Sequence, residues 1–69
     1  MTLEELRISV PMSVQELATA AGVSNQTIRN AEEGQRISVQ SARGIAEALS
    51  KALGRTIRVQ DIDGLQVRY

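Results

Sequence analysis

Residues 14–31 carry the most informative pattern of apolar and polar positions in this chain. The pattern predicts two short helices, over residues 14–21 and 25–33, joined by a tight turn at Gly22. Two helices that cross at a steep angle need a shared apolar face, and Ala18 and Gly22 are small where the backbones would approach most closely. The apolar or small positions recur at helical spacing: Leu17, Ala18, Ala21, Val23, Ile28 and Ala31.

Signals for helix starts and stops agree with this periodicity. A T-x-x-E pattern begins at Thr2 and an S-x-x-E pattern begins at Ser13, and both are typical of a capping box at a helix N-terminus. Pro11 ends the first helix before Val10, because a residue that precedes proline avoids the helical conformation. Single serine caps and left-handed glycines mark the other predicted helix ends: Ser24, Ser38, Gly22, Gly34 and Gly54.

The C-terminal half predicts one long helix, over residues 39–53, after a polar loop over residues 34–39 that Ile37 anchors. Gly44 lies inside this helix and is either a close contact with another helix or a tolerated surface glycine. The helix has an apolar stripe at helical intervals: Val39, Ala42, Ile45, Ala46, Leu49 and Leu53.

The tail, residues 55–69, has a mixed pattern. Residues 60–63 predict a short fifth helix around Ile62, and Leu65, Val67 and Tyr69 alternate as an edge strand would. The tail is therefore either folded onto its own core or a surface for dimerisation. The chain as a whole predicts one all-α domain over residues 1–69, a compact bundle of about five short helices that contains a helix-turn-helix and a short C-terminal β-strand.

Composition excludes several classes of function. The chain has no cysteine and no histidine, so we expect no disulfide, no zinc site or other metal, and no thiol or histidine catalysis. Tyr69 is the only aromatic residue, which disfavours single-strand binding by base stacking. No apolar run is long enough for a membrane span or a signal peptide, so we expect a cytoplasmic protein with no membrane partner.

An enzyme is also disfavoured. The carboxylates Glu4, Glu5, Glu32 and Glu33 fit helix ends or exposed faces rather than a convergent acid–base pair. A chain of 69 residues has little room to enclose a substrate pocket. We expect no cofactor and no small-molecule ligand.

The outer face of the predicted helix over residues 25–33 carries Asn25, Gln26, Arg29 and Asn30. The amides of Asn25 and Gln26 each offer a donor and an acceptor, the geometry for a bidentate pair with the major-groove edge of adenine. Arg29 suits guanine or a phosphate, and Asn30 lies one turn further along, near a neighbouring base. Each of these residues alone is an ordinary surface residue, so the set as a whole indicates DNA reading.

Two further groups of residues suit phosphate contacts. Ser24 and Thr27 lie at the start of the same helix, whose N-terminus favours an anion. The second group flanks the start of the helix over residues 39–53: Arg36, Ser38, Gln40, Ser41 and Arg43.

The distribution of charge qualifies this interpretation. A formal net charge of zero weighs against DNA binding, because phosphate contacts usually leave a basic imprint. Residues 1–33 contain two arginines against five glutamates, whereas residues 34–69 contain six basic residues against three acidic ones. For DNA binding, the position of the charges relative to the DNA groove therefore matters more than the net charge.

The run QELATAAGVSNQTIRNAEEGQR, followed by ARGIAEAL, resembles the lambda-repressor and Cro-like helix-turn-helix family, also called xenobiotic-response-element-like. The resemblance extends from Leu3 to about Ile62. It implies a five-helix domain that binds duplex DNA with the helix over residues 25–33 in the major groove. It also implies a structural ion pair between Arg7 and Glu32 that orients this helix.

The sequence departs from this family at three positions. Val14 stands where relatives often have a glutamine that touches phosphate and braces the next helix, and Ala31 is small where a larger apolar residue is usual. Glu33 places negative charge near the end of the reading helix.

These observations lead to two hypotheses of function. The first is a sequence-specific double-stranded DNA-binding transcriptional regulator, expected to be a repressor, located at the nucleoid and bound as a homodimer to half-sites about 34 Å apart. The alternative, motivated by the neutral charge, Val14 and Glu33, is a protein-interaction module with weak DNA binding, such as an antitoxin or a mobile-element accessory protein.

Overall fold

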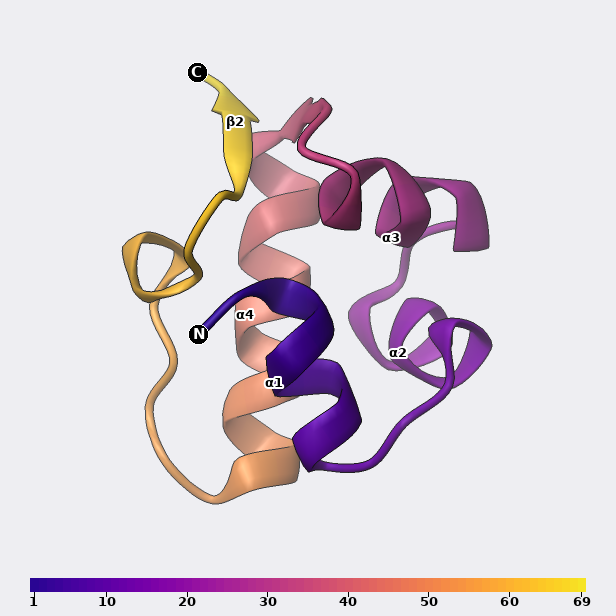
Figure 1. Ribbon diagram of the computed structural model, residues 1–69, viewed down its shortest axis with the longest axis vertical. Helices are drawn as coiled ribbons and strands as arrows, with labels where there is room; N and C mark the ends of the chain where they lie inside the picture. Colours follow the sequence, from indigo (N-terminus) through magenta and orange to yellow (C-terminus); the bar gives the residue numbers. More distant parts are fainter.

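Four α-helices and two short strands make up the structure, a computed structural model that describes residues 1–69 (Figure 1). The predicted all-α fold with a helix-turn-helix is confirmed, but the helix count of five is wrong. No helix is long and apolar enough to cross a membrane. In chain order the elements are α1 (Leu3–Ser9), α2 (Val14–Ala21), α3 (Asn25–Glu32), β1 (Arg36–Ser38), α4 (Val39–Leu53), a 3-10 turn η1 (Val59–Asp61) and β2 (Gln66–Arg68).

Both predicted capping boxes are present. The Thr2 hydroxyl accepts a hydrogen bond from the Glu5 backbone N–H, and the Glu5 carboxylate accepts one from the Thr2 backbone N–H at 2.8 Å. Ser13 and Glu16 repeat this arrangement at the start of α2, with distances of 2.9 and 3.0 Å. The backbone N–H of Thr2 lowers the pKa of Glu5, and that of Ser13 lowers the pKa of Glu16, because each hydrogen bond favours the charged carboxylate.

The turn between α2 and α3 has the predicted geometry. Gly22 ends α2 with a φ of +73°, a left-handed conformation that glycine adopts without strain. The Val23 backbone N–H then donates to the carbonyl of Ala18 at 3.0 Å, which satisfies one of the free carbonyls of the helix end. Ser24 caps α3 by accepting from the Thr27 N–H at 3.1 Å. Helix α3 ends at Glu32, one residue before the predicted end.

Helix α4 runs through the middle of the molecule, with α2 and α3 on one side and the tail on the other (Figure 1). The core is entirely apolar and receives side chains from every helix. Its most completely enclosed large side chains are Leu17, Ile28, Ile45 and Leu49.

Helices α4 and α2 are in close contact at Gly44. A Cβ atom at this position would lie 2.5 Å from the backbone carbonyl oxygen of Ala21, the last residue of α2. Of the two interpretations of Gly44, the structure therefore selects the close helix contact. The missing side chain lets the second turn of α4 lie directly beside the end of α2.

The predicted fifth helix over residues 60–63 is wrong. The segment Val59–Asp61 forms a single 3-10 turn, in which the Asp61 carboxylate accepts from the Arg58 N–H at 3.0 Å. Gly64 follows with a φ of +77°, which ends any helical path after this turn. Ser50 holds the start of the tail, because its hydroxyl accepts from the Ile57 N–H at 2.8 Å.

The polar loop predicted over residues 34–39 is also wrong in part, because residues 36–38 form strand β1. It pairs in parallel with β2, which confirms the predicted C-terminal strand. Ile57 and Ile62 are buried, and Leu65 and Val67 pack against the core. The tail therefore folds onto its own domain.

We expect Gly44→Ala to destabilise the fold although alanine favours helix by about 1 kcal/mol. The added methyl group meets a backbone carbonyl rather than a flexible side chain, so the helices must separate at a cost of about 1–3 kcal/mol. Urea unfolding measures the difference, with the exposed Glu47→Ala as a control that changes stability by no more than about 0.5 kcal/mol. An increase in stability for Gly44→Ala contradicts the close contact.

The capping glutamates make stability depend on pH. The folded-state pKa of Glu5 and of Glu16 lies below the unfolded-state value of about 4.3. Their contribution to the free energy of unfolding is therefore fully present above about pH 4.3. It is lost as the pH falls through the lowered pKa. The control is the double variant Glu5→Gln/Glu16→Gln, since glutamine accepts the same hydrogen bond without titrating. We expect the urea midpoint of the wild type to fall more than that of the double variant between about pH 6 and pH 3. Equal falls in both proteins refute this role.

Candidate nucleic-acid interface

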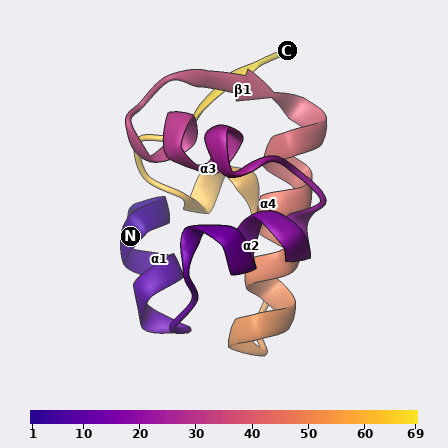
Figure 2. The same cartoon turned by 90° about the vertical axis from the view of Figure 1, so that its right-hand side faces the viewer.

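Helix α3 has one buried face and one polar face. Ile28 and Ala31 lie in the core, while Asn25, Gln26 and Arg29 are exposed. Seen from the side, α2 and α3 face the viewer together, with β1 passing above α3 (Figure 2). The polar face of α3 is thus open to solvent.

The polar side chains of α3 are ordered by hydrogen bonds among themselves. The Gln26 amide nitrogen Nε2 donates to Asn30 Oδ1 at 2.9 Å, across one helical turn. This bond directs Nε2 toward the C-terminal end of the helix, and Asn30 itself is half-buried. At the other end, the hydroxyls of Ser24 and Thr27 lie 2.9 Å apart as part of the cap.

The second predicted group lies where β1 runs into α4. Ser38 is the N-cap of α4 and accepts from the Ser41 N–H at 3.2 Å, so both serines serve the helix end. Arg36, Gln40 and Arg43 are exposed. Because Gly44 lies against Ala21, the first turns of α4 are close to the α2–α3 turn, and the two predicted groups of residues share one end of the molecule.

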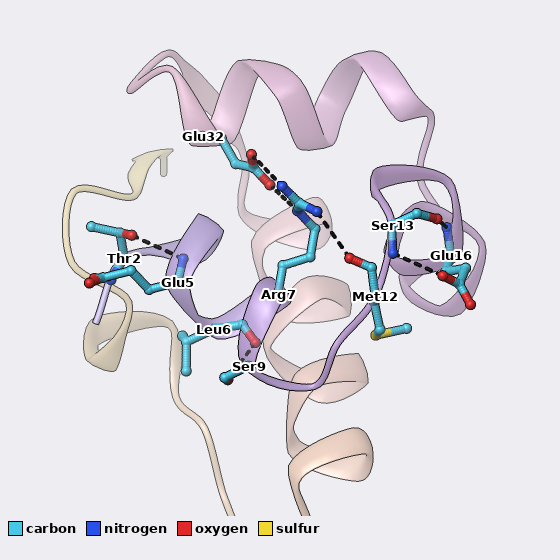
Figure 3. Close-up of polar contacts among 9 residues, drawn as sticks. All are labelled: Thr2, Glu5, Leu6, Arg7, Ser9, Met12, Ser13, Glu16 and Glu32. Carbon is cyan, nitrogen blue, oxygen red and sulfur yellow. Dashed lines mark hydrogen bonds and ion pairs between the residues drawn. The ribbon is translucent and has the colours of Figure 1, made fainter.

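A partly buried ion pair holds α3 in place (Figure 3). Arg7 Nε lies 2.7 Å from Glu32 Oε2, and a second guanidinium nitrogen donates to Glu32 Oε1 at 3.3 Å. The third nitrogen donates to the Met12 carbonyl at 3.0 Å. The side chains of Arg7 and Glu32 are only 15% and 12% exposed. The predicted ion pair is thus confirmed, and it ties the end of α3 to α1 and to the loop before α2.

The ion pair also decides which acidic group remains exposed at the end of α3. The hydrogen bond to Glu32 raises the pKa of Arg7, because it favours the charged guanidinium. The Glu32 carboxylate is turned inward onto Arg7, whereas Glu33 is exposed. Only one of these neighbouring acids can repel a phosphate.

One feature of this end of the molecule was not predicted. The parallel sheet brings Arg68 opposite Ser38, a pairing between distant segments that no local pattern reveals. Val14 is a position at which the sequence departs from the family pattern. Its side chain packs against the core and presents no polar group at the start of α2. On the outer side of α2 lies a hollow lined by Met12, Gln15, Glu16, Thr19 and Ala20.

The steep pair α2–α3, the glycine turn and the exposed polar face define a helix-turn-helix domain. A family model described as helix-turn-helix matches residues 3–58, and the chain belongs to this family, which is of the lambda-repressor type and binds DNA. The match ends before η1 and β2. Comparison with curated proteins gives no match, and comparison with solved structures gives none either.

We expect the removal of either partner of the Arg7–Glu32 pair to destabilise the fold. Arg7→Met leaves the Glu32 carboxylate partly buried and unpaired, and Glu32→Gln leaves the guanidinium without a counter-charge, each at a cost of about 2–3 kcal/mol. The double variant costs less than the two single variants together, because it leaves no unpaired charge.

Urea unfolding of the four proteins measures this coupling. The exposed pair Lys51–Glu47 provides the control, since its side chains are 78% and 70% exposed and Lys51→Ala should change little. Single variants of Arg7 and Glu32 that are no less stable than this control overturn the role of the pair.

Proposed function

We propose that this protein is a sequence-specific transcriptional regulator that reads duplex DNA with α3 in the major groove and acts as a repressor. The observation that carries the proposal is the exposed polar face of α3 within a helix-turn-helix. The Arg7–Glu32 ion pair ties the end of this helix to α1. Membership of a DNA-binding family supports it. Repression requires only that the bound domain occupies the site and excludes other proteins.

Gln26 is the residue best prepared to read a base. Its Nε2 carries two protons, of which one goes to Asn30 and the other is free, while its Oε1 accepts no hydrogen bond within the protein. A free donor beside a free acceptor matches N7 and N6 of adenine. Asn30 thus fixes the orientation of the Gln26 amide, and Arg29 and Asn25 extend the reading face to either side.

The remaining predicted residues contribute contacts to the backbone. The hydroxyls of Ser24 and Thr27 lie at the start of α3, and Arg36 and Arg43 supply positive charge near the start of α4. Gln40 adds a hydrogen-bonding group beside them, and Ser38 and Ser41 order the helix end. Such contacts position the domain on the duplex, whereas the face of α3 provides the specificity.

A homodimer is the form in which we propose that the protein binds. A single module of this kind buries about 600–1,000 Å² on DNA, at the low end for specific complexes. Two copies related by a two-fold axis read two half-sites about 34 Å apart and so recognise a palindrome.

A protein-interaction module is the second candidate. It is favoured by the apolar Val14, the exposed Glu33 and the hollow on the outer side of α2 beside Met12. In this case the helix-turn-helix is a scaffold, and a protein partner covers α2.

Selection from a randomised duplex pool separates the two candidates. For the regulator we expect one enriched motif, palindromic if the protein binds as a dimer. If no motif emerges and binding to every duplex vanishes at modest salt, the regulator is excluded. The protein-interaction module is then the remaining candidate.

We expect Gln26→Ala to weaken binding to the enriched motif by about 5- to 150-fold, the equivalent of about 1–3 kcal/mol, because it removes the bidentate contact. Binding to random duplex should stay unchanged. Fluorescence anisotropy measures both, with Gln60→Ala as the matched control, since Gln60 is an exposed glutamine of η1. Equal losses on both duplexes contradict base reading by Gln26.

A further inference from the structure

The two-stranded sheet places two arginines from distant segments on one surface. Arg36 pairs with Gln66, Ile37 with Val67, and Ser38 with Arg68. Successive side chains of a strand point to opposite faces, and the inner pair Ile37–Val67 packs on the core. Arg36 and Arg68 therefore both lie on the outer face, at diagonal positions about 8 Å apart by the spacing of residues and strands.

This outer face is positively charged and without a counter-ion. It consists of Arg36, Ser38, Gln66 and Arg68 and includes no acidic residue. The three ion pairs of the structure use Arg7, Lys51 and the N-terminal amine, so neither Arg36 nor Arg68 has a carboxylate partner. Both arginines are exposed.

The face also lies beside the reading helix. The Gln35 N–H donates to the Asn30 carbonyl at 2.8 Å, which holds the loop before β1 against the end of α3. Strand β1 then runs across the top of α3 to the start of α4 (Figure 2). A duplex that received the polar face of α3 would have its backbone close to this sheet.

We propose that the outer face of the β1–β2 sheet is a phosphate-contact surface, on which Arg68 joins Arg36 in holding the DNA backbone beside the segment that α3 reads. The inference rests on the proposed binding of duplex DNA. Arg68 lies outside residues 3–58, the part of the chain that the family model matches. The tail then has two roles, to close the core with Val67 and to supply a cation.

Arg68→Gln tests the proposal, with Arg55→Gln as a control of equal charge change. Arg55 follows the C-terminus of α4, about 22 Å from the end at which the sheet lies, given 1.5 Å per residue of helix. Anisotropy titrations over a series of salt concentrations give the slope of log K against log salt for the selected duplex and for a random one.

For Arg68→Gln we expect a slope shallower by about 0.9 and a several-fold loss of affinity that is equal on both duplexes, because a phosphate contact carries no sequence information. Arg68→Lys should retain most of the affinity, since a point charge still reaches a phosphate. Arg55→Gln should bind like the wild type. Unchanged thermal unfolding of Arg68→Gln shows that β2 still pairs.

Two results overturn the contact. One is a wild-type slope and affinity in Arg68→Gln, and the other is an equal loss in Arg55→Gln, which would reveal only the effect of total charge. Both leave the proposed function intact if the wild type binds its motif. Failure of the wild type to bind any duplex instead refutes the proposed function together with this inference.

Discussion

The close approach of α4 to α2 is the constraint on which the rest of the structure depends. Because position 44 has no side chain, the Ala21 carbonyl oxygen can lie 2.5 Å from the point that a Cβ atom would occupy. The start of α4 is thereby fixed next to the α2–α3 turn, and β1, which leads directly into α4, is fixed above α3. A wider separation of α2 and α4 would move the residues of the candidate interface that lie on β1 and α4. The steric requirement at Gly44 is thus also a requirement on the site.

The orientation of α3 is set by polar contacts at both ends rather than by the core alone. Ser24 caps its first turn, and Arg7 holds its last residue, Glu32, with a bidentate contact. A helix of eight residues buries only Ile28 and Ala31 fully, so apolar contact alone leaves its rotation weakly determined. The Arg7 guanidinium, which also binds the Met12 carbonyl, removes this freedom and links α3 to the segment that precedes α2. Base reading requires such rigidity, because hydrogen bonds to bases tolerate little displacement.

The sequence was sufficient for the parts of the fold that local rules determine. The capping boxes, the glycine turn at Gly22 and the limits of α4 depend on residues within a few positions of one another, and all were predicted. The ion pair of Arg7 came from the family resemblance. Strand β1 could not be predicted, since three residues have no strand pattern of their own and their partner lies in the tail. For the same reason Arg68 was not among the candidate site residues, whereas the side chains of α3 could be assigned to one face by helical spacing.

A net charge of zero does not describe the charge that a phosphate would meet. Six of the eight acidic residues have a local partner: Glu5, Glu16 and Asp61 accept from backbone N–H groups, and Glu32, Glu47 and Asp63 form ion pairs. These ion pairs use only two of the eight basic side chains, Arg7 and Lys51. Charges beyond about 8 Å are screened at physiological salt, so the local set decides the interaction. Around α3 and the sheet that set has one exposed acid, Glu33, against four exposed arginines: Arg29, Arg36, Arg43 and Arg68. A neutral chain can therefore present a basic surface where folding brings together more exposed arginines than exposed acids.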